Sequence, residues 1–451
     1  MLISAFLMFL VYSTLNSSII ILNRLGTLTI IFTLILLASS INIVSISPGI
    51  TLYNNWLSLT PYNLPIMFLI LVFSILFMIY STTYHRYDLK SPFLLVLVLA
   101  NIIGLLLFPL VNDIIALYII IELQSYSLYL ITGFHNKSYN ASRASLLYFF
   151  MGSIASATIL LSGYYIYSYT GTTNLSDIYI INNYTDTYNY FDILLVALLF
   201  KMGMAPLHRW SISVYNYAPT YITLYISIVA KLSIISFIFS NASLFHHHIL
   251  ILFFYISLII GAYKPLFQIN IKNILAYSGI LNFSYLLLTI IDFDVSFYIY
   301  IIQYTLTHLI LFFSILAASQ YIEKPFSIWS PLIFINQLKL PNIALAFCFI
   351  IALFSLIGIP PLPGFYAKYY ILAAAIQDNY ILEVCMIVIF SVIATYYYAN
   401  IIKILIKSNN VKSVNFVNPS IAYILSSSTI LLITFFLFLP SLSEGLYLIT
   451  L

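Results

Sequence analysis

The stretch LFKMGMAPLHRW at residues 199–210 places a glycine, a proline and charged side chains inside a long apolar run. The stretch GIPPLPGFYAK at residues 358–368 repeats this combination. Proline lacks the amide hydrogen that a helix needs, and its ring clashes with the preceding turn, so each stretch predicts an interrupted helix. A pair of interrupted apolar helices with charges beside the breaks is typical of membrane transport proteins.

The composition sets the environment of these two stretches. Of the 451 residues, 63% are hydrophobic and only 6% are charged. Such a chain cannot cover an aqueous surface with polar groups. Each membrane helix needs roughly 20 apolar residues, and the polar gaps divide the chain into about 14 such runs. We therefore expect an all-α membrane protein with about 14 transmembrane helices and no room for a catalytic domain outside the membrane.

The charges in the gaps alternate along the chain. Gaps after odd-numbered spans carry Arg24, Arg86, Lys90, Lys137, Arg143, Lys264, Lys272, Lys324, Lys339, Lys403, Lys407 and Lys412. Gaps after even-numbered spans carry no Lys or Arg but hold Asp113, Asp177, Asp186, Asp192, Asp292, Asp294 and Asp378. Because positive loops stay inside, both termini are predicted on the outer side of the membrane.

The two breaks fall in the predicted seventh and twelfth spans, five spans apart. Because five is an odd number, a duplicated five-span unit would re-enter the membrane upside down. We therefore predict two inverted five-helix repeats, each containing one broken helix. The predicted division is an N-terminal three-helix segment at 1–90, a first repeat at 91–243, a second repeat at 244–408 and a C-terminal helix at 409–451.

Glu122 lies in the apolar run IIIELQSYSLYL of the predicted fifth span. Tyr126 and Tyr129 follow at helical spacing and put hydroxyl groups along the same face. A charge at the centre of a membrane helix costs about 2.5–3.5 kcal/mol on insertion scales, so it is normally surrounded by protein or water and serves ion movement. The alternative interpretation is an ion pair that only holds helices together.

Three lysines also lie within apolar runs. Lys201 precedes the first break, Lys368 follows the second, and Lys231 lies in the middle of ISIVAKLSIISF, too far from either surface to reach it. A buried lysine can gain and lose a proton near neutral pH, whereas an arginine cannot. The three lysines are therefore candidates for reversible protonation, with a purely structural role as the alternative.

Three further residues are candidates of a second kind. His208 lies just past the first break, and His308 lies in YTLTHLILFF among threonine hydroxyls. Histidine titrates in the physiological range, so each is either a proton relay or a hydrogen-bonded core residue. Lys272 opens the predicted tenth span and is either a loop charge or a member of the relay.

Other chemistry finds little support in the sequence. The run His246, His247 and His248 resembles a metal site but falls in a short gap without Cys or carboxylate neighbours, so we interpret it as a loop. There is no phosphate loop, dinucleotide fingerprint, cysteine cluster or haem-type histidine pair. We expect this chain to bind no cofactor and no metal.

Several motifs together carry a resemblance to a known family. They are ELQSYSLYLITG at 122–133, LYFFMGSIASATILLSGYYIYSYTGT at 147–172, KMGMAPLHRW at 201–210, APTYITLYISIVAK at 218–231, NIKNILAYSGILNFSYLL at 270–287 and GIPPLPGFYAK at 358–368. In this order and spacing, they resemble the antiporter-like membrane subunits of respiratory complex I, which are similar to subunits of cation/proton antiporters. The first three spans and the last resemble the family only in being hydrophobic.

The resemblance implies a function and its residues. Glu122 matches the family's fifth-span glutamate, Lys201 and Lys231 its seventh- and eighth-span lysines, and Lys368 its twelfth-span lysine. The implied activity is proton translocation within an NADH:ubiquinone oxidoreductase, driven by quinone reduction elsewhere in the complex. The expected proton path consists of Glu122, Lys201, Lys231, Lys272, His208, His308 and Lys368, with Glu122 paired to Lys201.

The resemblance also implies the surroundings of the chain. NAD, FMN, iron–sulfur clusters and ubiquinone are expected in other subunits, and the partners are expected to be other membrane-arm subunits, lipids and protons, without nucleic acid. The 40 Tyr and 35 Phe residues fit an AT-rich genome. The three retained early spans resemble fungal or plant rather than animal versions, and we favour a fungal one. The expected location is the mitochondrial inner membrane, with both termini on the intermembrane-space side.

Two departures from the family pattern keep alternatives open. Ile212 and Ser213 stand where the family usually has Pro-Asp, and Arg143 and Leu147 stand where it commonly has an acidic residue and a lysine. A cation/proton antiporter subunit would use the same buried residues. A structural membrane-arm subunit without a proton path of its own is the second alternative.

Overall fold

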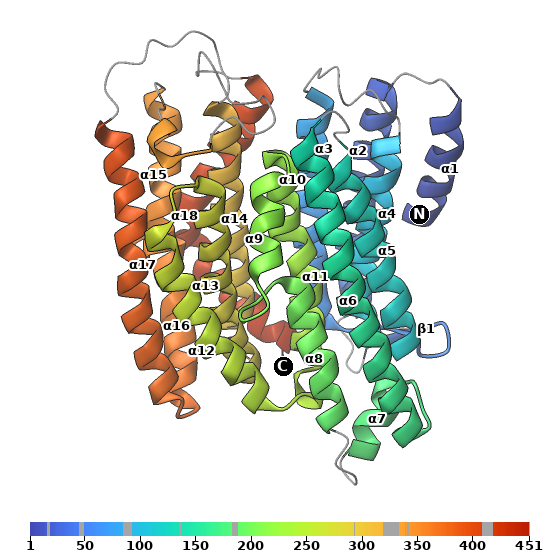
Figure 1. Ribbon diagram of the computed structural model, residues 1–451. Coiled ribbons are helices and arrows are strands. Elements are labelled where there is room, and N and C mark those ends of the chain that lie inside the picture. Colours follow the sequence, from blue (N-terminus) through green and yellow to red (C-terminus); the bar gives the residue numbers. More distant parts are fainter. Residues whose placement is uncertain are drawn as a thin grey trace. The chain divides into compact units, whose positions relative to one another are not determined.

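The computed structural model is built almost entirely of helices (Figure 1). It describes residues 1–15, 19–44, 49–83, 93–134, 138–182, 188–292, 294–318, 333–338, 340, 342–407 and 418–450. In chain order its elements are α1 (Leu2–Thr14), α2 (Ile19–Val44), β1 (Ile50–Leu52), β2 (Leu57–Leu59), α3 (Leu64–Thr83), α4 (Phe93–Leu107), α5 (Ile114–Gly133), α6 (Tyr139–Thr170), α7 (Leu175–Asn182), α8 (Tyr188–Met202), α9 (Arg209–Tyr217), α10 (Thr220–Tyr225), a π-helical turn (Ile226–Ala230), α11 (Lys231–Ser240), α12 (His247–Tyr263), α13 (Ile271–Asp292), α14 (Ser296–Ala318), α15 (Ile343–Ile357), α16 (Pro363–Gln377), α17 (Ile381–Lys407) and α18 (Pro419–Thr450).

The expected membrane class is confirmed by the length of these helices. Within the described ranges, 11 helical segments are long and apolar enough to cross a membrane. The predicted spans not among them are the first, where α1 has only 13 residues, and the two interrupted ones. Because of these three spans, the count of about 14 stays a prediction, as do the inverted repeats. β1 and β2 form a small antiparallel pair that the sequence did not predict.

The chain forms two compact units. Unit 1 comprises Met1–Met202, Val229–Ile249 and Thr450, and unit 2 comprises Gly203–Ile228 and Leu250–Ile449. Two of the changes between units fall at the first predicted helix break and inside the π-helical turn. The predicted division at 90, 243 and 408 rests on internal repetition, which compactness does not test, so it remains a prediction.

Unit 1 is organised around α5. Figure 1 shows α4, α5 and α6 running alongside one another, and α6 also packs on α8. The start of α5 is fixed by Asp113, whose carboxylate accepts hydrogen bonds from the amides of Ile115 and Ala116. The same carboxylate accepts a bond from the Thr173 hydroxyl at 2.7 Å. This cap satisfies amides that the first helical turn leaves without partners and thereby fixes where α5 begins.

Unit 2 is organised around α14, which packs against α13, α15 and α16. The helix α15 starts at the Asn342 side chain, which accepts a bond from the Ala344 amide, and ends at Gly358 with φ +94°. Pro363 is the first residue of α16. Glycine takes this left-handed conformation without strain, and proline suits a first helical position, so the chain stops one helix and starts another inside the predicted twelfth span.

The first predicted break is present as well. α8 ends at Met202, Gly203 follows with φ +73°, and α9 begins only at Arg209. A side chain at Gly203 would meet Ser211, so the position needs glycine for space as well as for its backbone angle. Both interruptions predicted from proline and glycine therefore occur in the structure.

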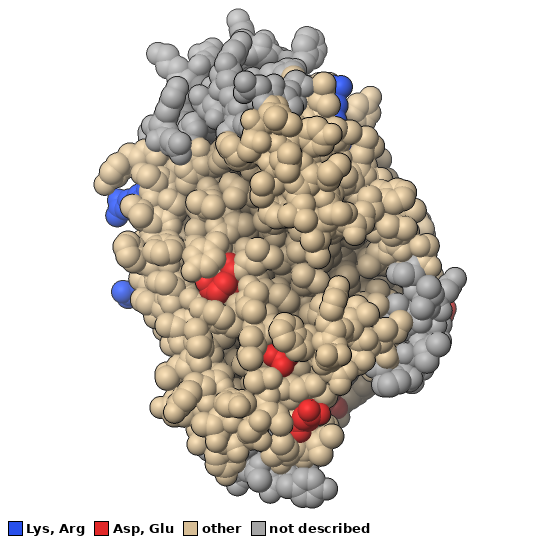
Figure 2. All heavy atoms as spheres, turned by 90° about the vertical axis from the view of Figure 1, so that its right-hand side faces the viewer, with Lys and Arg blue, Asp and Glu red and all other residues tan. Residues whose placement is uncertain are grey.

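The outer surface has few charges. Figure 2 shows a broad face of uncharged side chains with only scattered Lys, Arg, Asp and Glu. Large apolar side chains such as Leu7, Phe150 and Ile154 are exposed in unit 1, and Ile343 and Val392 in unit 2. This surface suits lipid or another membrane subunit rather than water. Arg86, Lys90, Lys137, Asp186, Lys324, Lys339 and Lys412 lie outside the described residues, so the predicted orientation stays untested.

Candidate functional site

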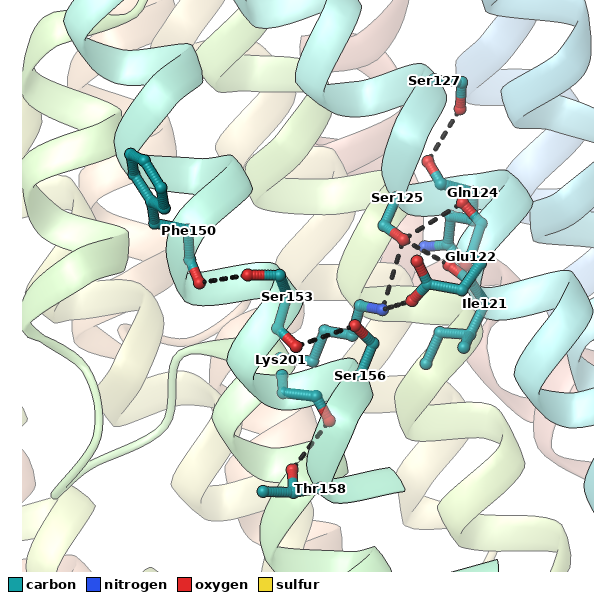
Figure 3. Close-up of polar contacts among 11 residues, drawn as sticks. Ile121, Glu122, Gln124, Ser125, Ser127, Phe150, Ser153, Ser156, Thr158 and Lys201 are labelled. Atoms are coloured by element: carbon teal, nitrogen blue, oxygen red, sulfur yellow. Dashed lines mark hydrogen bonds and ion pairs between the residues drawn. The ribbon is translucent and has the colours of Figure 1, made fainter. Parts of the chain in front are cut away.

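The expected ion pair between Glu122 and Lys201 is present in unit 1. Glu122 lies in the middle of α5, and Lys201 lies in the last turn of α8. The Lys201 ammonium donates to Glu122 Oε1 at 3.2 Å and to the Ser125 hydroxyl at 3.3 Å. Figure 3 shows the ammonium between these two groups. The Lys201 and Glu122 side chains are only 6% and 12% exposed, so both charges are shielded from solvent.

This pair has a defined chemical capacity. An isolated charge at this depth would be costly, and the partner of opposite charge is what makes each tolerable. A pair of one carboxylate and one ammonium is neutral overall. A proton that arrives or leaves changes the net charge of the pair, so the pair responds to charges that move nearby.

A polar network links α5 to the start of α11. The Gln124 amide donates to the Ala230 carbonyl oxygen at 3.2 Å, and its side-chain oxygen accepts from the Ser233 hydroxyl. The Asn101 amide donates to the Gln124 carbonyl oxygen at 2.9 Å. Ala230 ends the π-helical turn, and buried Lys231 is the next residue. Gln124 therefore fixes the backbone that carries Lys231, two residues along α5 from the ion pair.

The π-helical turn explains how Lys231 is presented. Such a turn holds one more residue than a regular helical turn, so it disturbs the regular hydrogen-bond ladder and is frequent at functional sites. Gln124 in unit 1 bonds to the Ala230 carbonyl, and Tyr304 in unit 2 donates to the Ser227 carbonyl at 3.2 Å.

Lys272 is a buried residue of unit 2, not a loop charge. It lies in the first turn of α13, and its ammonium donates to the Ala218 carbonyl oxygen at 2.7 Å. Ala218 directly follows α9 and precedes Pro219, so it lies at a helix end. Carbonyls at helix ends carry partial negative charge and need donors.

Lys368 uses the second break in a similar way. Although it belongs to α16, its ammonium reaches back to the end of α15 and donates to the carbonyl oxygens of Leu356 and Ile357, at 2.9 Å each. These carbonyls are among the last of α15, and no intrahelical donor follows them because the chain turns at Gly358. The lysine therefore binds the negative end of the first half-helix.

The two histidines have different surroundings. His208 Nδ1 lies 3.1 Å from the Pro206 carbonyl oxygen, which can only accept, so this nitrogen carries a hydrogen. His308 is fully buried in α14, with its ring centroid 4.1 Å from that of Tyr304. His308 therefore packs against the ring of the tyrosine whose hydroxyl bonds to the π-helical turn.

The structure joins Glu122 directly to Lys201, and it places Lys231 next to the same polar network. Lys272, Lys368, His208 and His308 all belong to unit 2. Ser125, Gln124 and Asn101 are not among the residues predicted from the sequence. Their signal was available in part, because Ser125 lies three residues after Glu122 and thus on the same helical face. Tyr126, which is predicted on that face, does lie close enough to Glu122 to interact with it, although its side chain is 53% exposed.

The histidine run also differs from the expectation. No carboxylate lies beside it in the sequence, but Asp192 from α8 reaches His246, with 2.7 Å between its Oδ2 and the ring Nδ1. The contact could not be predicted from the sequence, because Asp192 and His246 are 54 positions apart. Among the described residues there is no group of three His, Cys, Asp or Glu side chains that could hold a metal ion.

The fold and the site together define a class. This is a multi-pass helical membrane protein in which buried ionisable side chains lie at helix interruptions. Secondary transporters have this arrangement. Residues 111–395 match the membrane family described as NADH:quinone oxidoreductase/Mrp antiporter. The chain belongs to this family.

Individual relatives agree with the family match. The chain is 65% identical over 448 residues to NADH-ubiquinone oxidoreductase chain 2 of Debaryomyces hansenii, covering 99% of each chain. It is 52% identical over 456 residues to the protein of the same name from Candida albicans, covering 100% of this chain and 96% of that one. A chain of respiratory complex I from Thermus thermophilus with bound aureothin has the same fold, with a TM-score of 0.81, 21% identity and coverage of 99% and 98%.

Proposed function

We propose that this chain is a proton-translocating membrane subunit of an NADH:ubiquinone oxidoreductase. The observation that carries the proposal is the buried pair of Glu122 and Lys201 at 3.2 Å, located where α8 ends inside the predicted seventh span. The names of the two yeast relatives support the oxidoreductase over a separate cation/proton antiporter. NAD, FMN, iron–sulfur clusters and ubiquinone then belong to other subunits of the complex.

The proposed mechanism moves protons between groups that are already held in place. Glu122, Lys201 and Lys231 form the part of the path in unit 1, and Lys272, His208, His308 and Lys368 form the part in unit 2. Lys201, Lys272 and Lys368 each bind an oxygen atom at 2.7–3.2 Å. A change of charge beside one pair alters the proton affinity of the next group, which lets quinone reduction elsewhere in the complex drive transfer along the row.

We further propose the mitochondrial inner membrane as the location, with both termini on the intermembrane-space side. The neighbours are other membrane-arm subunits and lipids. The broad uncharged face in Figure 2 is compatible with both. The loop charges described above support the orientation through the positive-inside rule.

The proposal is tested by substituting Lys201→Met in the parent complex and measuring proton uptake per NADH oxidised in proteoliposomes. Methionine is unbranched and only one atom shorter than lysine, but it can neither carry nor release a proton. Lys403→Met is the matched control, because Lys403 is exposed on α17. We expect a lower proton-to-electron ratio for Lys201→Met and an unchanged ratio for the control. An unchanged ratio in both, at equal assembly, would make the ion pair structural.

A further inference from the structure

Unit 2 contains a buried group of polar side chains that the proposed proton path does not use. Its members come from α13, α14 and α17 and are almost entirely shielded from solvent: Ser278, Asn282, Tyr285, Tyr300, Tyr397 and Tyr398. We call this group the tyrosine cluster. Tyrosine hydroxyls in an apolar interior normally find hydrogen-bond partners, so a concentration of them raises the question of what satisfies them.

One hydrogen bond within the cluster is complete. The Tyr300 hydroxyl donates to Asn282 Oδ1 at 2.8 Å. This bond orients the side-chain amide of Asn282, since its oxygen faces α14 and its Nδ2 group must face elsewhere. The side chains of Tyr397, Ser278 and Asn282 lie close to the Tyr398 hydroxyl, but none of them reaches it with hydrogen-bond geometry. The ring centroids of Tyr285 and Tyr300 lie 5.7 Å apart, and Tyr398 is also near Tyr300.

Four polar atoms of the cluster have unmet hydrogen-bonding capacity. Within the part of the chain that the structure describes, no protein group bonds to Asn282 Nδ2 or to the hydroxyls of Tyr285, Tyr397 and Tyr398. All four are buried. Leaving several such groups unsatisfied is costly, and folded proteins satisfy them with ordered water, which typically makes about three hydrogen bonds. The cluster offers both donors and acceptors, as a bound water requires.

We propose that the tyrosine cluster is a binding site for a small group of buried water molecules. Asn282 Nδ2 donates to one of them, and the hydroxyls of Tyr285, Tyr397 and Tyr398 complete their coordination. The site is distinct from the ion pair and from the lysines at the helix breaks, because none of its four unsatisfied atoms belongs to those residues.

The position of the site suggests its use, which rests on the function proposed above. Tyr300 lies near Tyr304, whose hydroxyl bonds to the Ser227 carbonyl in the π-helical turn and whose ring lies against His308. Water-bridged hydroxyls can pass a proton, because each group accepts one proton and releases another and regains its original charge. The cluster therefore extends the path from His308 towards α17.

The far end of this extension is defined by α13. Asp292 ends that helix, seven residues after Tyr285, so the two side chains share a helical face about 10 Å apart along the axis. Both Asp292 carboxylate oxygens are shielded and have no hydrogen-bond partner among the described residues. Water that leaves the tyrosine cluster along this face thus meets a carboxylate at the end of the span.

The site itself is tested by high-resolution cryo-electron microscopy of the whole parent complex. The expected result is ordered density within hydrogen-bond distance of Asn282 Nδ2 and of the Tyr398 hydroxyl. Direct bonds between these side chains, without density between them, would overturn the proposal. This measurement needs no variant and does not depend on proton translocation.

The role of the site is tested with Tyr398→Phe, which removes one hydroxyl and little volume. The matched control is Tyr396→Phe, because Tyr396 lies on the same helix but is exposed. We expect Tyr398→Phe to lose part of the water density and to lower proton uptake per NADH, and the control to change neither. If Tyr398→Phe does not assemble, Tyr285→Phe provides the same comparison.

The outcomes separate this inference from the proposed function. If Tyr398→Phe leaves the proton ratio unchanged while Lys201→Met lowers it, the water is structural and the extended path is wrong, although the proposed function stands. If Lys201→Met leaves the ratio unchanged, the proposed function fails. The density at Asn282 then still decides whether the water site exists.

Discussion

Gly364 at the start of α16 offers a sharp test of how the second break holds Lys368. A Cβ atom added at Gly364 would fall well inside contact distance of the Ser355 carbonyl oxygen on α15, and roughly 1.5 Å of separation would be needed to relieve it. The two hydrogen bonds from Lys368 to Leu356 and Ile357 are 2.9 Å long. If the bonds lengthened by that displacement, they would reach about 4.4 Å, beyond hydrogen-bond range.

We therefore expect Gly364→Ala to have two measurable effects in the assembled complex. Overpacking of this kind costs about 1–3 kcal/mol of stability, which should lower the temperature at which NADH oxidation is lost. A displacement of about 1 Å at a reacting group can slow transfer roughly 100-fold, so proton uptake per NADH should also fall. Gly445→Ala is the control, because nothing lies within 4 Å of a Cβ there.

Each result of the Gly364→Ala experiment bears on a different step. Normal stability together with a normal proton ratio would refute the close approach of α15 and α16. A loss of stability with a normal ratio would show that the two carbonyl contacts of Lys368 do not matter for transfer. A lower ratio in Gly445→Ala would indicate that any added methyl group disturbs the complex.

Two further predictions concern the buried charges. Glu122→Gln should leave the Lys201 ammonium without its counter-charge. Because one partner of a buried pair is lost, the stability of the complex should fall by about 3–5 kcal/mol, measured as a lower temperature of thermal inactivation. Glu444→Gln, at an exposed position, should leave that temperature unchanged, and equal behaviour of the two variants would contradict a buried pair. Lys272→Met should deprive the Ala218 carbonyl of its donor at a cost of about 1–3 kcal/mol, measured in the same way. An unchanged inactivation temperature would mean that water or another group replaces the lysine.

The helix interruptions could be predicted because their causes are local. Gly203, Gly358 and Pro363 act through their own backbone angles or missing amide, which depend little on distant parts of the chain. The membrane class and the burial of Glu122 followed from the same kind of signal, since a long apolar run leaves a charge nowhere else to go.

The partners of the buried lysines could not be predicted in the same way. The acceptor for Lys272 is the carbonyl of Ala218, 54 residues away, and any residue type could supply that atom. The π-helical turn before Lys231 contains neither glycine nor proline, so no local signal marks it. Contacts of this kind are set when helices pack, and a backbone carbonyl leaves no trace in the sequence.

The hydrogen bonds from Lys368 to the end of α15 have a consequence for the hydration of the second helix break. The carbonyl oxygens of Leu356 and Ile357 are satisfied only while the ammonium stays with them. When the lysine moves away, these oxygens need other donors, and in the interior of a membrane protein water is the mobile donor. We therefore expect water to enter the helix break when Lys368 moves away and to leave it when the lysine returns.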